Sequence, residues 1–203
     1  MSKLATILLV ILAVLVIIGI GSCSALVGRY NSIVTLDESA NKAWGKVDNQ
    51  YQRRNDLIPN MMESVKGYLA FEKETLIAVT EARKQVTDIK VSGEEIAKNP
   101  ILQKQFLDAQ QNLGSALSRL MVVVEKYPEL KASQVMIGFM DEQAGTENRV
   151  ATERGRFQDS INEYNSTIRR FPSNIIAGVF GFGKRDYYQA EQGADKAPKV
   201  KFN

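Results

Sequence analysis

The residues that could do chemistry in this chain are arginines, carboxylates and one amide, gathered in two short runs. In chain order they are Arg53, Arg54, Asp56, Glu147, Asn148 and Arg149. The 203-residue chain has no histidine and only one cysteine. The commonest neutral-pH base and metal ligand is therefore absent, and a single cysteine can form neither an intrachain disulfide nor a cysteine-based zinc site. We expect no catalytic residue, no metal site and no cofactor.

Arg54 lies on the same helical register as Val47 and Met61, so its side chain should point inward. Because a buried charge is costly unless it is paired, we expect Arg54 to contact a carboxylate such as Glu147 on a facing helix. Two interpretations stay open. The two runs could form a polar layer that fixes helix register, or an ionisable site for a small ligand or ion. We favour the structural layer.

Long amphipathic segments must position these residues. Apolar residues recur at three-and-four spacing from Arg29 onward, and again in two later segments that end near Pro128 and Phe171. Pro59 should kink the first helix or divide it in two, and residues 87–100 should form a connection. No strand pattern appears. The sequence predicts an all-α fold, an elongated antiparallel bundle of three to four long helices with coiled-coil spacing.

The N-terminus predicts a membrane anchor, because no charged residue occurs from Leu4 to Gly28. About 25 helical residues at ~1.5 Å each exceed the ~30 Å hydrocarbon core of a bilayer. Three forms fit: a retained span, a cleaved signal peptide, or a lipoprotein signal in which Cys23 is acylated. We favour the retained single span. The predicted organisation is an anchor or lipoprotein-type signal at 1–28, a bundle at 29–172, and an apolar, glycine-rich segment with a tail at 173–203.

The tail segment carries an apolar run that is too short to span a bilayer. Its large side chains are Ile175, Ile176, Val179, Phe180 and Phe182. Packing against the bundle is one interpretation, and contact with a membrane interface or a partner is the other. Flanking charges lean toward a cytoplasmic bundle, whereas the lipoprotein signature and the short N-terminal tail favour an extracytoplasmic one, which we expect. A net charge of only +3 does not indicate nucleic-acid binding.

Several motifs resemble one known family. They are Trp44, the run QYQRRNDLIPN at 50–60, VKGY at 65–68, EAR at 81–83, YPELKA at 127–132, ENR at 147–149, Tyr164-Asn165 and Phe171-Pro172. In this order and spacing they resemble the LemA family over nearly the whole chain. The resemblance implies an N-terminal membrane segment, a long helical bundle and no established enzymatic activity. Some relatives are associated with building bacterial membrane compartments.

Together these features predict a non-enzymatic protein of the bacterial cell membrane. We expect the bilayer to hold its N-terminal segment and other membrane or envelope proteins to bind its bundle, which would then act as a scaffold or adaptor. Two alternatives stay open: a membrane-remodelling or organelle-biogenesis component, and a small-ligand sensor that uses the polar layer. The oligomeric state does not follow from the sequence.

Overall fold

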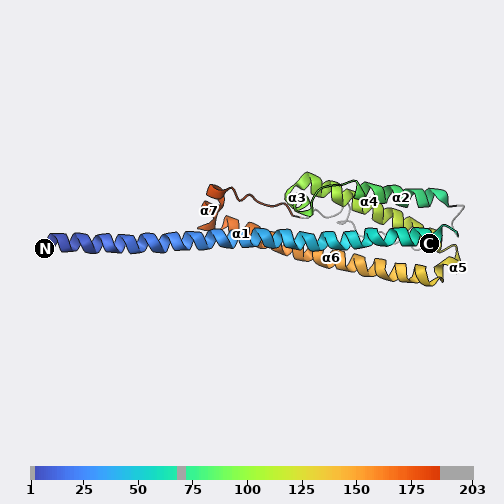
Figure 1. Cartoon of the computed structure of the whole chain (residues 1–203), viewed down its shortest axis with the longest axis horizontal. Helices are drawn as coiled ribbons and strands as arrows, with labels where there is room; N and C mark the ends of the chain where they lie inside the picture. Colours follow the sequence, from blue (N-terminus) through green and yellow to red (C-terminus); the bar gives the residue numbers. More distant parts are fainter. Residues whose placement is uncertain (1–2, 68–71, 188–203) are drawn as a thin grey trace, which may run out of the picture. The chain divides into compact units, whose positions relative to one another are not determined.

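The computed structural model describes residues 3–67 and 72–187, and these residues form helices joined by turns and short loops, with no strand among them (Figure 1). Its helices are α1 (Lys3–Val65), α2 (Lys73–Thr87), α3 (Gly93–Lys98), α4 (Pro100–Val124), α5 (Pro128–Lys131), α6 (Gln134–Arg169) and α7 (Ser173–Phe180). The predicted all-α class is therefore confirmed. The final tail, 188–203, lies outside the described residues.

The N-terminal part of α1 is long and apolar enough to cross a membrane, and none of its apolar window is buried by the rest of the protein. Large side chains such as Leu8, Leu15 and Ile20 are exposed. Exposure of so many contiguous aliphatic side chains is unfavourable in water and favourable in hydrocarbon. A signal sequence has the same properties, so the three predicted forms of the anchor stay open.

Pro59 does not divide the first helix, because α1 continues through it to Val65. The proline removes one backbone donor and should weaken the helix locally. However, Ile58, Met61 and Val65 are all fully buried, so the apolar face continues on both sides of the proline. Burial of this face offsets the lost hydrogen bond. The interruption falls instead between Val65 and Lys73.

The predicted connection at 87–100 contains a short helix, α3, which begins at Gly93, and Pro100 begins the next helix, α4. Ser92 Oγ accepts a hydrogen bond from the Glu95 amide at 3.2 Å, and Glu95 Oε2 accepts one from the Ser92 amide at 3.1 Å. This reciprocal pair is a capping box. Asn99 then caps α4, and Pro100 takes the first position of that helix, where no amide donor is needed.

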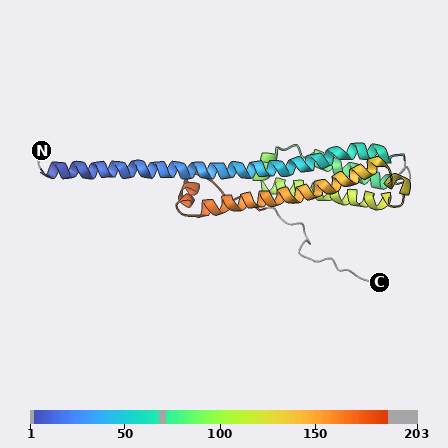
Figure 2. The same cartoon turned by 90° about the horizontal axis from the view of Figure 1, so that it is seen from below.

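The chain divides into two compact units, residues 1–40 with 160–185 and residues 41–159 with 186–203. In the second unit, α1, α2, α4, α5 and α6 share one apolar core around Ile58, Val79, Leu117, Leu130 and Phe139. Nearer the N-terminus of α1, around Trp44, the side chains that pack together are aromatic. The Trp44 ring centroid lies 5.1 Å from that of Phe157 and 5.9 Å from that of Phe106. Figure 2 shows the same helices from below.

The first unit has a smaller core in which α7 packs on α1 and α6. Ile33, Tyr164, Ile168 and Ile176 are buried together there. Phe171 was expected to end the apolar stripe of the third long helix, but it is largely exposed. That prediction is wrong because α6 ends at Arg169, so position 171 no longer follows the helical register.

Candidate functional site

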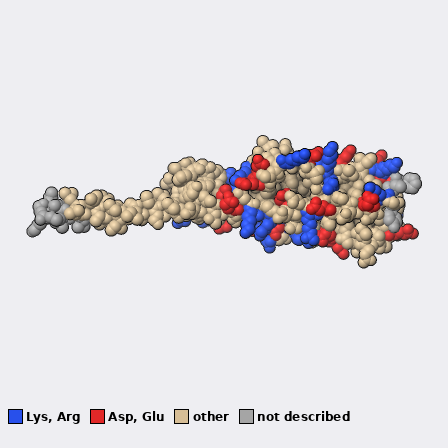
Figure 3. All heavy atoms as spheres, viewed as in Figure 1, with Lys and Arg blue, Asp and Glu red and all other residues tan. Residues whose placement is uncertain are grey.

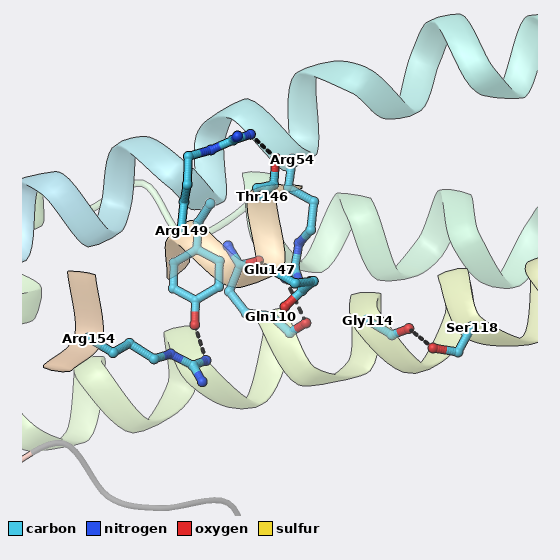
Figure 4. A network of polar contacts seen from close by, with 9 residues as sticks. Arg54, Gln110, Gly114, Ser118, Thr146, Glu147, Arg149 and Arg154 are labelled. Carbon is cyan, nitrogen blue, oxygen red and sulfur yellow. Dashed lines mark hydrogen bonds and ion pairs between the residues drawn. The ribbon is translucent and has the colours of Figure 1, made fainter. Parts of the chain in front are cut away.

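Arg54 is the centre of the polar layer in the second unit. Its side chain is 4 % exposed, and its Nη1 donates to Glu147 Oε1 at 2.6 Å, as the helical register predicts. Its Nη2 donates to the carbonyl oxygen of Gln110 at 3.0 Å and also to the Gln110 side chain. The three residues come from α1, α4 and α6 (Figure 4). A buried guanidinium is tolerable because several acceptors replace its lost hydration.

Tyr51, one turn before Arg54 on α1, lies between two guanidinium groups. The Cζ atoms of Arg54 and Arg154 lie 5.2 Å and 5.5 Å from the centroid of its ring. Arg154 also donates to the Tyr51 hydroxyl, which is the dashed line from Arg154 to the unlabelled ring in Figure 4. The aromatic face stabilises both cations through cation–π attraction. The ring therefore holds two like charges close together.

A second, more exposed group of ion pairs centres on Glu142. Its Oε1 lies 2.6 Å from Arg53 Nε and 2.7 Å from Arg149 Nη2. Arg149 also donates to Gln50 Oε1 at 3.1 Å and to Thr146 Oγ1 at 2.8 Å. Partly solvated pairs of this kind contribute little individually. Their shared carboxylate nevertheless links α1 to α6.

The structure does not bring every predicted site residue into this layer. Arg53, Arg54, Glu147 and Arg149 take part in it. Asp56 and Asn148 are exposed, and within the described residues no hydrogen bond or ion pair joins their side chains to it. Gln110 was not predicted, although it is in register with Phe106 and Leu113 on the buried face of α4. The periodicity of α4 could have predicted that Gln110 points inward, and a buried arginine needs such an acceptor.

Beside the layer is a cleft of about 820 Å³ between α1, α4 and α6. Its lining carries three arginines, Arg54, Arg119 and Arg154, against one carboxylate, Glu147. Arg119 is exposed and has no ion-pair partner among the described residues. Leu117, Met121 and Phe139 supply an apolar part of the lining. The cleft has the size of a small-molecule pocket, and its charge favours an anion over a cation.

The first unit contains a second buried polar cluster, which sequence reasoning missed. Arg185 lies in the extended segment after α7, and its Nε donates to Asp37 Oδ1 at 2.9 Å. Asn165 pairs with the backbone of Arg185 twice, at 2.9 Å to its amide and 2.8 Å to its carbonyl. The Tyr164 hydroxyl donates to the carbonyl oxygen of Gly183 at 2.9 Å. We call these residues, Asp37, Tyr164, Asn165 and Arg185, the latch.

Two titratable side chains have shifted pKa values. Burial raises the pKa of Tyr164, the nearby Asp37 carboxylate raises it further, and Arg185 opposes the shift. Burial also raises the pKa of Asp48, whose carboxylate lies beneath α3 close to Gly93. Neither group lines the cleft. Among the described residues, no three histidine, cysteine, aspartate or glutamate side chains are grouped so as to hold a metal ion.

Three named proteins are similar to this chain in sequence, and the matched part spans about seven tenths of the length of each. The chain is 26 % identical over 199 residues to "Magnetosome protein MamQ" of Magnetospirillum gryphiswaldense, covering 91 % of this chain and 73 % of that protein. It is 26 % identical over 187 residues to "Magnetosome protein MamQ 2" of Paramagnetospirillum magneticum, covering 85 % and 69 %. It is also 28 % identical over 166 residues to "Protein LemA" of Metamycoplasma hominis, covering 82 % and 71 %.

The family comparison agrees with the motifs quoted above. The sequence pattern of the LemA family matches residues 43–202, which include α2 to α7 and the part of α1 that carries Arg54. The match covers more than half of the chain. The chain belongs to the LemA family.

Proposed function

We propose that this protein is a non-enzymatic, single-pass membrane protein of the bacterial cell envelope whose bundle is a scaffold or adaptor for other envelope proteins. The observation that carries the proposal is α1. One unbroken helix, Lys3–Val65, contains both the candidate membrane span and the buried arginine of the polar layer. The helix that begins in the candidate span therefore also supplies residues of the bundle core. Likeness to the LemA and MamQ proteins supports membrane association.

The chemistry of the bundle supports a binding role over a catalytic one. Arg54 is paired with Glu147 and Gln110, and Glu142 is paired with both Arg53 and Arg149. No histidine exists to serve as a neutral-pH base. We further propose that α1, α2, α4 and α6 form an antiparallel bundle, since the short α5 connects α4 to α6 and one core joins all four helices.

Photocrosslinking tests the scaffold role. A photoreactive residue would replace Ile77 or Ile101, two exposed apolar residues of the bundle, in the full-length protein in its own membrane. We expect discrete crosslinked species of reproducible mass from at least one position. The control is the same residue at Ile18 in the span, which should crosslink to lipid. Bundle positions that yield only uncrosslinked protein would contradict the scaffold proposal.

The extracytoplasmic placement and the form of the anchor are tested separately. Val122 is exposed on α4, so Val122→Cys in a Cys23→Ser background should react with a membrane-impermeant maleimide in intact cells. Labelling only after lysis would place the bundle in the cytoplasm. Incorporation of labelled fatty acid into the wild type but not into Cys23→Ser would establish the lipoprotein form instead of the retained span.

A membrane-remodelling function is the second candidate, and likeness to proteins named as magnetosome proteins favours it. The full-length chain would be reconstituted into vesicles at rising protein-to-lipid ratios and imaged by electron cryomicroscopy. Remodelling predicts narrower or tubular vesicles as the ratio increases. Vesicles indistinguishable from those with an unrelated single-span protein would exclude it.

A ligand sensor is the third candidate, favoured by the arginine-rich cleft. Small carboxylates and inorganic phosphate should raise the melting temperature of the detergent-solubilised chain by mass action. Arg119→Gln should abolish that rise, because the exposed Arg119 lines the cleft without an internal partner. Lys104→Gln, which removes the same charge from α4 outside the cleft, should leave it intact. Equal responses from both variants would contradict a cleft site.

A further inference from the structure

The helix α7 has one buried face and one exposed apolar face. Ile176 and Ala177 are buried against the core of the first unit. On the other side Val179 is 74 % exposed, and Ile175, Phe180 and the preceding Phe171 are also largely exposed. Four large apolar side chains close together in the sequence form a patch that water solvates poorly. Of the five apolar residues predicted to contact the bundle, a membrane or a partner, Ile176 and Phe182 pack against the core. The other three belong to the exposed patch.

The exposed face lies next to the end of the candidate membrane span. The ring centroid of Tyr30 lies 4.8 Å from that of Phe180 and 5.6 Å from that of Phe182. Tyr30 is two residues after Gly28, the end of the uncharged segment, which amounts to about 3 Å along a helix. In Figure 3 the surface of α7 carries no charge and is continuous with the uncharged surface of the anchor.

The charges that flank the patch are basic. Arg29 follows the span, Arg169 and Arg170 precede α7, and Lys184 follows it, all four being exposed. Glu163 is the one acidic residue between 160 and 185, and Asp159 and Asp186 lie directly outside that range. Aromatic and aliphatic side chains bordered by arginine and lysine are typical of helices that lie in the headgroup region of a bilayer. Anionic headgroups attract each nearby basic residue by about 1 kcal/mol.

We propose that α7 lies in the membrane interface and binds anionic lipid there, with Phe171, Ile175, Val179 and Phe180 inserted among the acyl chains. The inference rests on the proposed membrane anchorage. A bilayer is favoured over a protein partner because the patch continues the lipid-facing surface of α1 and the flanking cations match anionic headgroups. The protein would thus contact the bilayer through an interfacial helix as well as through the span.

Site-directed fluorescence in proteoliposomes tests the proposal on the full chain. A polarity-sensitive dye on Val179→Cys, in a Cys23→Ser background, should emit at shorter wavelength and be quenched by lipids that carry a quencher near the headgroup. Val122→Cys is the matched control, because it also replaces an exposed valine. Val122 is 65 % exposed but lies on α4 in the second unit. Its dye should report water and escape quenching. The same result at Val179 would overturn the proposal.

A second arm separates lipid from protein contact. A blue-shifted dye at Val179 that lipid-borne quenchers do not reach would mean that a second copy or another protein covers α7, and would also overturn the proposal. In vesicles with anionic lipid the quenching should exceed that in neutral vesicles. The double variant Arg169→Gln and Arg170→Gln should lose this difference while keeping the helical content, and retention of the difference would contradict the role of anionic lipid.

Membrane extraction distinguishes this failure from that of the proposed function. If alkaline carbonate releases the chain from membranes, the anchorage itself is wrong. If the chain resists extraction while the Val179 dye reports water, the anchorage holds and only the interfacial position of α7 is refuted.

Discussion

The two units each bury one arginine against a carboxylate, but they use it differently. In the second unit Arg54 is 4 % exposed and Glu147 is 49 % exposed. In the first unit Arg185 is 7 % exposed and Asp37 is 22 % exposed. Arg54 lies beside a cleft, whereas the segment that carries Arg185 is also held at its backbone by Asn165. The same pair of residue types therefore borders an open site in one unit and fastens a chain segment in the other.

The difference teaches that a buried ion pair does not by itself mark a functional site. The latch satisfies its arginine with a largely enclosed carboxylate, which leaves little room for a ligand to compete. Glu147 is half in water, so an incoming anion could replace it on Arg54 at smaller cost. Mutations that remove one partner from each pair should therefore have unequal effects.

Removal of Asp37 should have the largest effect. Asp37→Ala leaves Arg185 buried without its carboxylate, and we expect a loss of about 3 kcal/mol in the stability of the first unit. The measurement is hydrogen exchange of the Arg185 amide, which donates to Asn165 and should lose protection. Glu38→Ala, an exposed neighbour, is the control and should change little. Unchanged protection in Asp37→Ala would show that Asn165 and Tyr164 alone hold the segment.

Removal of Glu147 should have about half that effect. Glu147→Ala leaves Arg54 with the two Gln110 acceptors and access to water from the cleft, so we expect a loss of about 1.5 kcal/mol. Urea unfolding followed by Trp44 fluorescence reports on this unit, since Trp44 is buried in its core. If Glu147→Ala lowers stability as much as Asp37→Ala does, the proposed difference between the two ion pairs is wrong.

Tyr164→Phe tests whether the Tyr164 hydroxyl of the latch contributes to stability and to its dependence on pH. The substitution removes the hydrogen bond to Gly183, at a cost of about 1 kcal/mol near neutrality. Because the pKa of folded Tyr164 lies above its ordinary value of 10.0, the folded state retains the proton more strongly than the unfolded state. Wild-type stability should therefore fall as the pH rises above about 10. The variant should lack the part of this fall that is due to Tyr164. Parallel pH profiles of the two proteins would contradict it.

The sequence predicted the polar layer better than the latch, for a physical reason. Val47, Tyr51, Arg54, Ile58 and Met61 follow a strict three-and-four spacing, and all five are buried. Helical periodicity thus identifies an inward arginine and requires a partner for it. Arg185 lies in an extended segment with no periodicity. Its partner Asp37 is 148 residues away, so no local pattern predicts the contact.

Helix ends were harder to predict than helix faces. Of the two outcomes predicted for Pro59, division of the helix is wrong, because a buried apolar face stabilises a helix across one lost hydrogen bond. Gly67, which follows α1 after Lys66, was the better stop signal, since glycine favours helix C-termini. Similarly, Ser92 with Glu95 and Asn99 with Pro100 are helix-start signals inside what was predicted to be a connection. The two-faced character of α7 needed the structure, because eight residues contain too few turns to define a face.

The smallest expected effect concerns a third acid, the partly buried Asp48, which has no arginine partner among the described residues. Asp48 receives one hydrogen bond, from Gln52 at 3.4 Å, and burial raises its pKa. The folded state therefore binds its proton more tightly, so the charged carboxylate reduces stability at neutral pH, and this penalty disappears as the pH falls below the ordinary value of 3.8. Asp48→Asn keeps the shape and removes the charge. Because the carboxylate is partly solvated, its penalty is screened, and stability at pH 7 should rise by only about 0.3 kcal/mol. Thermal unfolding at pH 7 and at pH 3.5 measures it, with the gain vanishing at the lower pH. A loss at pH 7 would mean that the charged carboxylate stabilises α3, and Asp48 would then belong with Asp37 as an acid on which the fold depends.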